Sequence, residues 1–78
     1  MSNEEIEALN KIVAMIDEKA AKYKNEYGHM PRARAAAEKK LVLDLIDNGI
    51  DLAKRITPPP YDLMDDLTRL QSQLKRLA

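Results

Sequence analysis

Apolar residues recur every three or four positions along the first third of the chain. They are Ile6, Leu9, Val13, Ile16, Ala20, Tyr23 and Tyr27. This alternation is the a/d heptad pattern of helices that pack in a coiled-coil-like manner. Ser2, followed three residues later by Glu5, is a capping-box signature, and Gly28 is a typical C-terminal stop. The pattern predicts a helix over about residues 2–27.

The middle of the chain has a denser apolar pattern. Its members are Leu41, Val42, Leu43, Leu45, Ile46, Ile50, Leu52, Ala53 and Ile56. On a helical wheel they cover roughly half the circumference, which indicates a helix with more than one neighbour. Pro31 suits a first helical position, so we predict a helix over about residues 31–56.

Asn48-Gly49 is a turn signal inside this second helix. The heptad spacing nevertheless continues through it, at Val42, Leu45, Gly49, Leu52 and Ile56. We therefore predict an unbroken helix, in which Gly49 costs about 1 kcal/mol of helix propensity and permits close approach of a neighbouring helix.

The last pattern consists of leucines spaced four and three residues apart: Leu63, Leu67, Leu70, Leu74 and Leu77. Aspartates crowd its first turn and basic residues its last, as the helix macrodipole favours. It predicts a helix over about residues 61–77. The chain is thus expected to be all-α, an antiparallel three-helix unit forming a single domain over residues 1–78.

The segment between the second and third helices is Pro58-Pro59-Pro60-Tyr61. Three prolines in an extended conformation span roughly 9 Å, which matches the ~8–10 Å between packed helix axes. We interpret the segment as a connector, with Tyr61 packing at the entrance to the third helix. The same residues also satisfy the P-P-x-Y pattern, so a WW-domain ligand is a lesser alternative.

Chain length favours self-association. For 78 residues the free energy gained from apolar burial and the conformational entropy lost on folding nearly cancel, and the chain has no cysteine for a disulfide. We therefore expect a homodimer that completes the fold. The predicted interface comprises Ala33, Ala37, Val42, Leu45, Gly49 and Leu52. No apolar run approaches the ~20 residues of a membrane span, and the lack of cysteine fits a cytoplasmic protein.

The net charge is zero but unevenly distributed. Residues 1–18 carry −4, residues 19–40 carry +5 and residues 41–78 carry −1. Arg32 and Arg34 lie at a predicted helix N-terminus, where acidic residues are preferred, and such a conflict with stability hints at function. The third helix is expected to stop about 10 Å short of this basic tip and to leave it uncovered. The candidate partner-binding residues are Tyr23, Tyr27, His29, Met30, Arg32, Arg34, Lys39 and Lys40.

Three uses of the basic tip compete. Two copies of the chain could pack tip against tip, with the alanines permitting close contact. A different protein with an acidic and apolar surface could dock there. Nucleic acid could bind, with cations on phosphates and tyrosines stacking on bases. Zero net charge makes nucleic acid the alternative rather than the main hypothesis. The predicted function is a small interaction module or regulator that self-associates and binds an unidentified protein partner.

Catalytic and metal-binding groups are sparse in the sequence. Ser2 and Ser72 lie near the termini, far in sequence from His29, and the two glycines provide no phosphate-binding loop. Three aspartates share one predicted helix face, but they lack the spacing of a calcium-binding loop, and such faces are usually solvated. We therefore predict no enzyme, no metal site and no cofactor.

Overall fold

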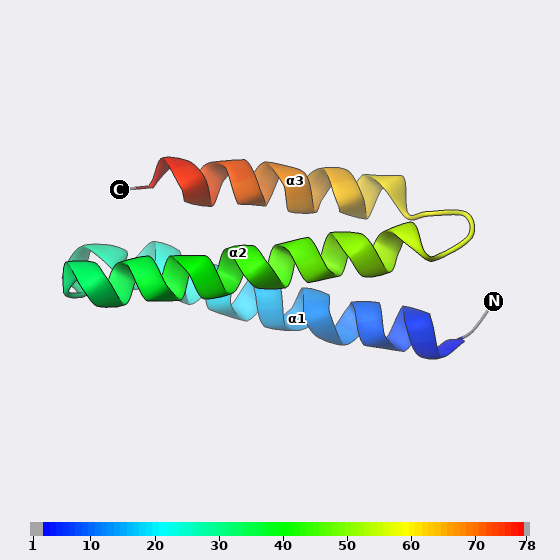
Figure 1. Ribbon diagram of the computed structural model, residues 1–78, viewed down its shortest axis with the longest axis horizontal. Coiled ribbons are helices and arrows are strands. Elements are labelled where there is room, and N and C mark those ends of the chain that lie inside the picture. The colour runs from blue at the N-terminus through cyan, green and yellow to red at the C-terminus, as the bar shows by residue number, and fades with distance from the viewer. Residues whose placement is uncertain (1–2, 78) are drawn as a thin grey trace.

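The structure, a computed structural model, describes residues 3–77. It consists of α1 (Asn3–Glu26), a short 3-10 helix η1 (Tyr27–His29), α2 (Arg32–Lys54) and α3 (Tyr61–Arg76). Figure 1 shows α2 between α1 and α3, with each helix antiparallel to the next. The molecule is elongated, with extents of 44 × 19 × 16 Å. The predicted all-α antiparallel three-helix unit is confirmed.

The hairpin between α1 and α2 differs in detail from the prediction. The first helix ends at Glu26 and continues into the 3-10 helix that contains Gly28. No described glycine has a positive φ, so the expected glycine cap is wrong. Pro31 precedes α2 as its N-cap instead of occupying the first helical position. The predicted capping residue Ser2 lies outside the described residues.

The connection between α2 and α3 begins earlier than expected, because α2 ends at Lys54. The backbone N–H of Met64 donates to the Pro60 carbonyl at 3.0 Å, so α3 starts directly after the prolines. A proline disfavours helical conformation in the residue before it, which accounts for a helix that starts only when the prolines end. The Tyr61 side chain is 66% exposed, so the prediction that it packs at the helix entrance is wrong.

The core follows one stripe of α2. Its buried members are Val42, Ile46, Gly49, Ala53 and, just beyond the helix, Ile56. Leu45 and Leu52 of the predicted heptad are only half-buried beside this stripe. The stripe packs against buried side chains of both neighbours: Leu9, Ile16, Ala20 and Tyr23 of α1, and Leu67 and Leu74 of α3.

Gly49 lies where α2 approaches both neighbours, and the helix is unbroken there, as predicted. A Cβ at this position would lie 3.2 Å from Ile16 Cδ1 and 3.4 Å from both Ile12 Cγ2 and Leu67 Cδ1. Val42 and Gly49 were expected at a subunit interface. Both are buried within the chain's own bundle, so neither faces a surface open to a second copy.

The packing around Gly49 can be tested by adding side-chain atoms of increasing size. Gly49→Ala should change the free energy of unfolding by less than about 1 kcal/mol, because a gain in helix propensity offsets small displacements of the isoleucine and leucine methyl groups. Gly49→Leu should destabilise by about 3 kcal/mol or more, since several carbons would enter a filled core. Urea unfolding followed by circular dichroism measures both values.

Gly28→Ala is the matched control, because a Cβ added there would meet no heavy atom within 4 Å beyond its chain neighbours and its own helical turn. This change should be neutral or stabilise by up to about 1 kcal/mol through the unfolded chain. A Gly49→Leu variant as stable as the wild type would contradict the close helix packing.

Candidate functional site

Antiparallel packing gathers basic residues at the end of the molecule where α1 meets α2. The C-terminal end of α3 reaches the same region. The Lys24 ammonium donates to Gln73 Oε1 at 3.4 Å, and the Lys39 ammonium donates to the Leu77 carbonyl. Lys75 and Arg76, in the last turn of α3, therefore join the basic residues of the hairpin. We call residues 18–44 and 72–77 the basic end.

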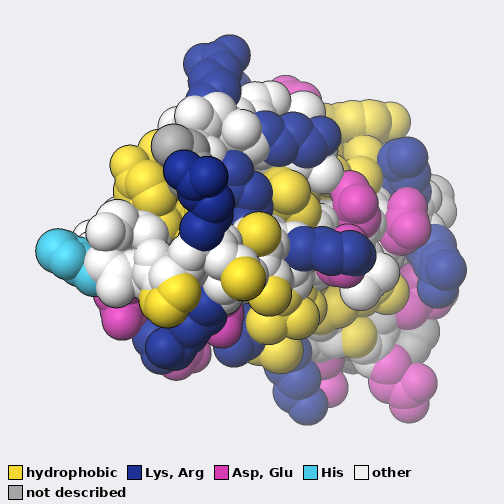
Figure 2. All heavy atoms as spheres, turned by 60° about the vertical axis from the view of Figure 1, so that its left-hand side comes forward, with side chains coloured by type: hydrophobic (Ala, Val, Ile, Leu, Met, Phe, Trp, Pro, Cys, Tyr) yellow, Lys and Arg dark blue, Asp and Glu magenta, His cyan; other side chains and the backbone are white. Residues whose placement is uncertain are grey.

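The two halves of the molecule carry opposite net charge. The basic end holds nine Lys and Arg residues against four Asp and Glu residues, a net +5. The rest, residues 1–17 and 45–71, holds four basic against nine acidic residues, a net −5. The hydrogen bond from Gln71 to Asp47, at 2.7 Å, lies close to the boundary. Figure 2, in which the hairpin end comes forward, shows Lys and Arg side chains interspersed with hydrophobic ones.

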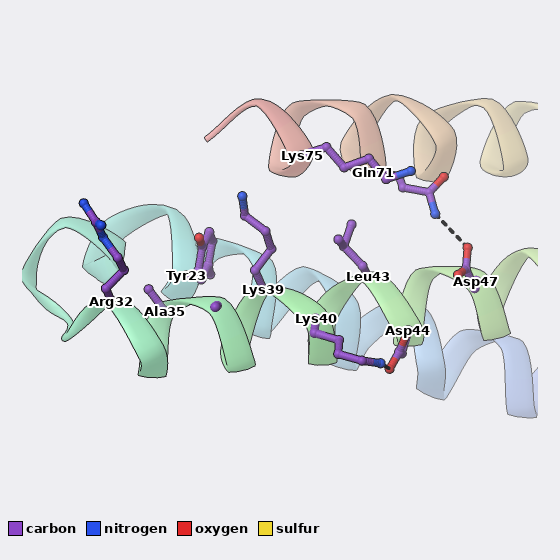
Figure 3. A pocket seen from close by; sticks show the side chains of 11 residues that line it. Tyr23, Arg32, Ala35, Lys39, Lys40, Leu43, Asp44, Asp47, Gln71 and Lys75 are labelled. Carbon is purple, nitrogen blue, oxygen red and sulfur yellow. Dashed lines mark hydrogen bonds and ion pairs between the residues drawn. The ribbon is translucent and has the colours of Figure 1, made fainter. Parts of the chain in front are cut away.

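A groove of about 460 Å³ lies between α2 and α3 and extends into the basic end. Its apolar lining comprises Ala35, Ala36 and Leu43 of α2, with Tyr23 of α1 behind them. Figure 3 shows Leu43 pointing from α2 toward α3. The apolar part of the groove can receive a side chain of a ligand, because these side chains carry no hydrogen-bonding groups apart from the Tyr23 hydroxyl.

Charged side chains line the same groove in order along α2. The cations Arg32, Lys39 and Lys40 come first, and the carboxylates Asp44 and Asp47 follow toward the middle of the molecule. Along α2 the lining therefore changes from cations to carboxylates. Lys75 adds a further cation from α3, and Figure 3 shows its side chain reaching toward Gln71, on the side of the groove that the carboxylates line.

Both carboxylates of the groove already have partners. Asp47 accepts the hydrogen bond from Gln71, and Asp44 Oδ2 lies 2.9 Å from the Lys40 ammonium. The side chains of Arg32 and Lys75, in contrast, make no hydrogen bond or ion pair with any other described residue. The unpaired charge of the groove is therefore positive, and its electrostatic complement is an anionic group.

Tyr23 is 2% exposed and belongs to the core. The half-buried ring of Tyr27 stacks on it, with ring centroids 5.6 Å apart and planes 23° apart. The prediction that Tyr23 stands on an uncovered tip is wrong, because its side chain is buried in the core cluster, against which Tyr27 and Leu77 also pack. The hairpin nevertheless extends past the end of α3 in Figure 1.

The structure separates the other predicted binding residues. Arg32 lines the α2–α3 groove, whereas Arg34 lines a hollow on the opposite side of α2, between α1 and α2. Two residues turn a helix by about 200°, which explains the separation. His29 is exposed in the 3-10 helix, and Met30, which lines the Arg34 hollow, is half-buried.

Sequence reasoning did not connect Lys75, Gln71 and Leu43 with the binding site. The sequence pattern explains the basic residues of the last helical turn, which include Lys75, only by the negative end of their own helix. The antiparallel order was a usable signal, because it brings the last turn of the third helix to the same end as the first hairpin.

No three His, Asp or Glu side chains within residues 3–77 are grouped so that they could hold a metal ion. Among the described helices, none combines the length and the apolar character needed to cross a membrane. Comparison with known protein families, with curated proteins and with solved structures finds no match to this chain.

The two arginines in the first turn of α2 are predicted to serve binding and not folding. Both are exposed and lie where the macrodipole disfavours cations. Arg32→Ala combined with Arg34→Ala should therefore leave the melting temperature unchanged or slightly raised. Circular dichroism thermal melts measure this, and unfolding of the double variant would show that the arginines are structural.

Lys40 and Asp44 provide a test of the groove's electrostatics. The hydrogen bond to Asp44, together with its negative charge, raises the pKa of Lys40 above the ordinary value of 10.5. Because the folded-state pKa is raised, the pair stabilises the fold below about pH 10.5 and this contribution is lost as the pH rises through the folded pKa. Asp44→Asn should return the pKa of Lys40 toward 10.5 in an NMR titration. An unchanged titration would show that the pair does not form in solution.

Proposed function

We propose that this protein is a small helical interaction module that binds an acidic, amphipathic segment of another protein in the α2–α3 groove. The observation that carries the proposal is that one groove combines an apolar lining with the Arg32 and Lys75 side chains, which have no partner among residues 3–77. An amphipathic helix in a groove is a common mode of peptide recognition, and carboxylates beside its apolar side chains would meet the free cations. The function is binding and not catalysis.

The burial and mutual stacking of the two tyrosines favour a protein ligand over nucleic acid. Recognition of single-stranded nucleic acid commonly uses exposed aromatic faces on which bases stack. Tyr23 is buried, and one face of Tyr27 is occupied by Tyr23. The basic end thus has cations for phosphates but offers only the outer part of the half-buried Tyr27 ring for stacking, whereas its apolar groove suits an aliphatic side chain of a peptide.

The proline segment is less suited to a WW domain. WW domains bind an extended polyproline conformation. Tyr61 is the first residue of α3, and the Met64 N–H donates to the Pro60 carbonyl at 3.0 Å. Binding would therefore require the first turn of α3 to unwind, which supports the role of the prolines as a connector.

A selection of random peptides on the immobilised protein tests the proposed ligand class. Enriched sequences should combine Asp or Glu with Leu or Ile at helical spacings of three and four residues. Arg32→Glu with Lys75→Glu should weaken binding of a selected peptide by about tenfold or more, since each reversal places a carboxylate beside an acidic ligand. Fluorescence anisotropy of a labelled peptide measures the affinity.

Lys11→Glu with Lys54→Glu is the matched control. It changes the net charge by the same amount on exposed residues of the other half, and Lys54, like Lys75, lies in the last turn of its helix. This control should alter the affinity by less than about threefold at physiological ionic strength, where exposed charges farther away than ~8 Å are screened. Equal losses in both variants would contradict binding in the groove. Tight, steeply salt-dependent binding of RNA or DNA without peptide enrichment would favour the nucleic-acid alternative.

A further inference from the structure

Apolar side chains remain uncovered on a second surface, formed by α1 and α2. Met15 and Leu41 are each 44% exposed, Leu45 and Leu52 are half-buried, and Ala37 is exposed. The four α2 residues lie within about 80° of arc, because spacings of four and eleven residues return to nearly the same side of a helix. We call these five residues the α1–α2 face.

This face points away from α3 and from the groove. Asp47 of α2 accepts a hydrogen bond from α3. Leu45 lies two residues before Asp47, so its side chain is about 200° around the helix from the side that contacts α3. On α1, the Lys24 ammonium donates to Gln73 of α3. Met15 lies nine residues before Lys24, which corresponds to half a turn of the helix, so it is on the side away from α3. A molecule on the α1–α2 face would leave the groove open.

The α1–α2 face straddles the boundary between the two oppositely charged halves. Leu41 belongs to the basic end and Leu52 to the acidic half. A Cβ added at Gly49 would lie within 3.4 Å of the Ile12 and Ile16 side chains of α1. Met15, which directly precedes Ile16, is therefore at the same level along the molecule as the residues around Gly49. The apolar side chains are therefore centred close to the plane where the charge changes sign.

We propose that this face binds a second copy of the chain in antiparallel orientation, about a twofold axis perpendicular to the long axis. Each basic end, with net +5, then lies beside the acidic half of the partner, with net −5. The twofold axis makes the contact isologous, so the same face is buried on both copies. The apolar side chains hold the dimer together, and the charges select its orientation.

The charge distribution also weighs against the other arrangements of two copies. Packing tip against tip, or side by side in parallel, brings two ends of net +5 together. In the antiparallel arrangement three members of the predicted interface, Ala37, Leu45 and Leu52, are in contact. Val42 and Gly49 are not, because they are buried within each bundle.

Two substitutions on the same helix test which face is used. Leu41→Gln places an amide on the α1–α2 face, and Leu43→Gln makes the same change on the groove side. Sedimentation equilibrium should show that Leu41→Gln raises the dimer dissociation constant about tenfold or more, as the loss of a buried leucine implies. Leu43→Gln should change it by less than threefold, and circular dichroism should show that both variants fold. A wild-type protein that stays monomeric up to about 1 mM, or equal effects of the two changes, overturns the proposal.

Cross-linking tests the orientation of the two copies. The chain has no native cysteine, so every disulfide that forms involves an introduced one. Arg34 and Arg55 lie near the α1–α2 face at its basic and acidic extremes, and both are exposed. An equimolar mixture of Arg34→Cys and Arg55→Cys chains should form disulfides that join residue 34 of one copy to residue 55 of the other, as identified by mass spectrometry. Each variant alone should cross-link at least tenfold less. Preferred linkage of residue 34 to residue 34 overturns the antiparallel arrangement.

Ionic strength provides an independent readout. Raising the salt concentration from physiological to about 1 M shortens the screening length from ~8 to ~3 Å and should weaken the antiparallel selection. The ratio of 34–55 to 34–34 linkages should therefore fall several-fold. A ratio that rises with salt would show that charge does not select the orientation.

Discussion

At Gly49, α2 packs closely against both neighbours: a Cβ added there would lie within 3.4 Å of Ile12 and Ile16 of α1 and of Leu67 of α3. Together with the buried stripe of α2, this packing holds the three helices in register. The buried stripe of α2 on either side of Gly49 then faces α1 and α3. Leu45 and Leu52 lie beside the stripe, on the α1–α2 face. The candidate groove and the α1–α2 face both lie beside this stripe, so their positions depend on it.

The antiparallel order converts an uneven charge sequence into an electric dipole. The acidic start of α1 and the aspartates at the start of α3 come to one end, and the basic hairpin and the last turn of α3 come to the other. A chain of zero net charge thereby has halves of +5 and −5. Acidic and basic residues at the appropriate helix ends also suit the macrodipoles of α1 and α3, so the same distribution favours the stability of these helices. The first turn of α2, with Arg32 and Arg34, is the exception.

Both proposed surfaces use α2, and they use opposite sides of it. Arg32 and Leu43 face the groove, while Arg34 and Leu41, each two residues away, lie on the α1–α2 side. A rotation of about 200° per two residues separates the two proposed surfaces. The wide apolar arc in the sequence of α2 accounts for contacts with two helices of its own bundle, and the exposed apolar residues at its edges contribute to both proposed surfaces.

Local patterns determined the three helices, the continuity of α2 through Gly49 and the connector at the prolines, because periodicity and proline geometry act within a few residues. The antiparallel order followed from the short connections. Only the tertiary structure decided that Val42 and Ile46, and not Leu45, form the central stripe, since both spacings are helical and the choice depends on neighbouring helices. It also decided that Tyr23 is buried, that Asp47 accepts a hydrogen bond from Gln71 and that the Lys75 side chain lines the groove without a partner among residues 3–77. Those outcomes depend on contacts between residues distant in sequence, which no local pattern specifies.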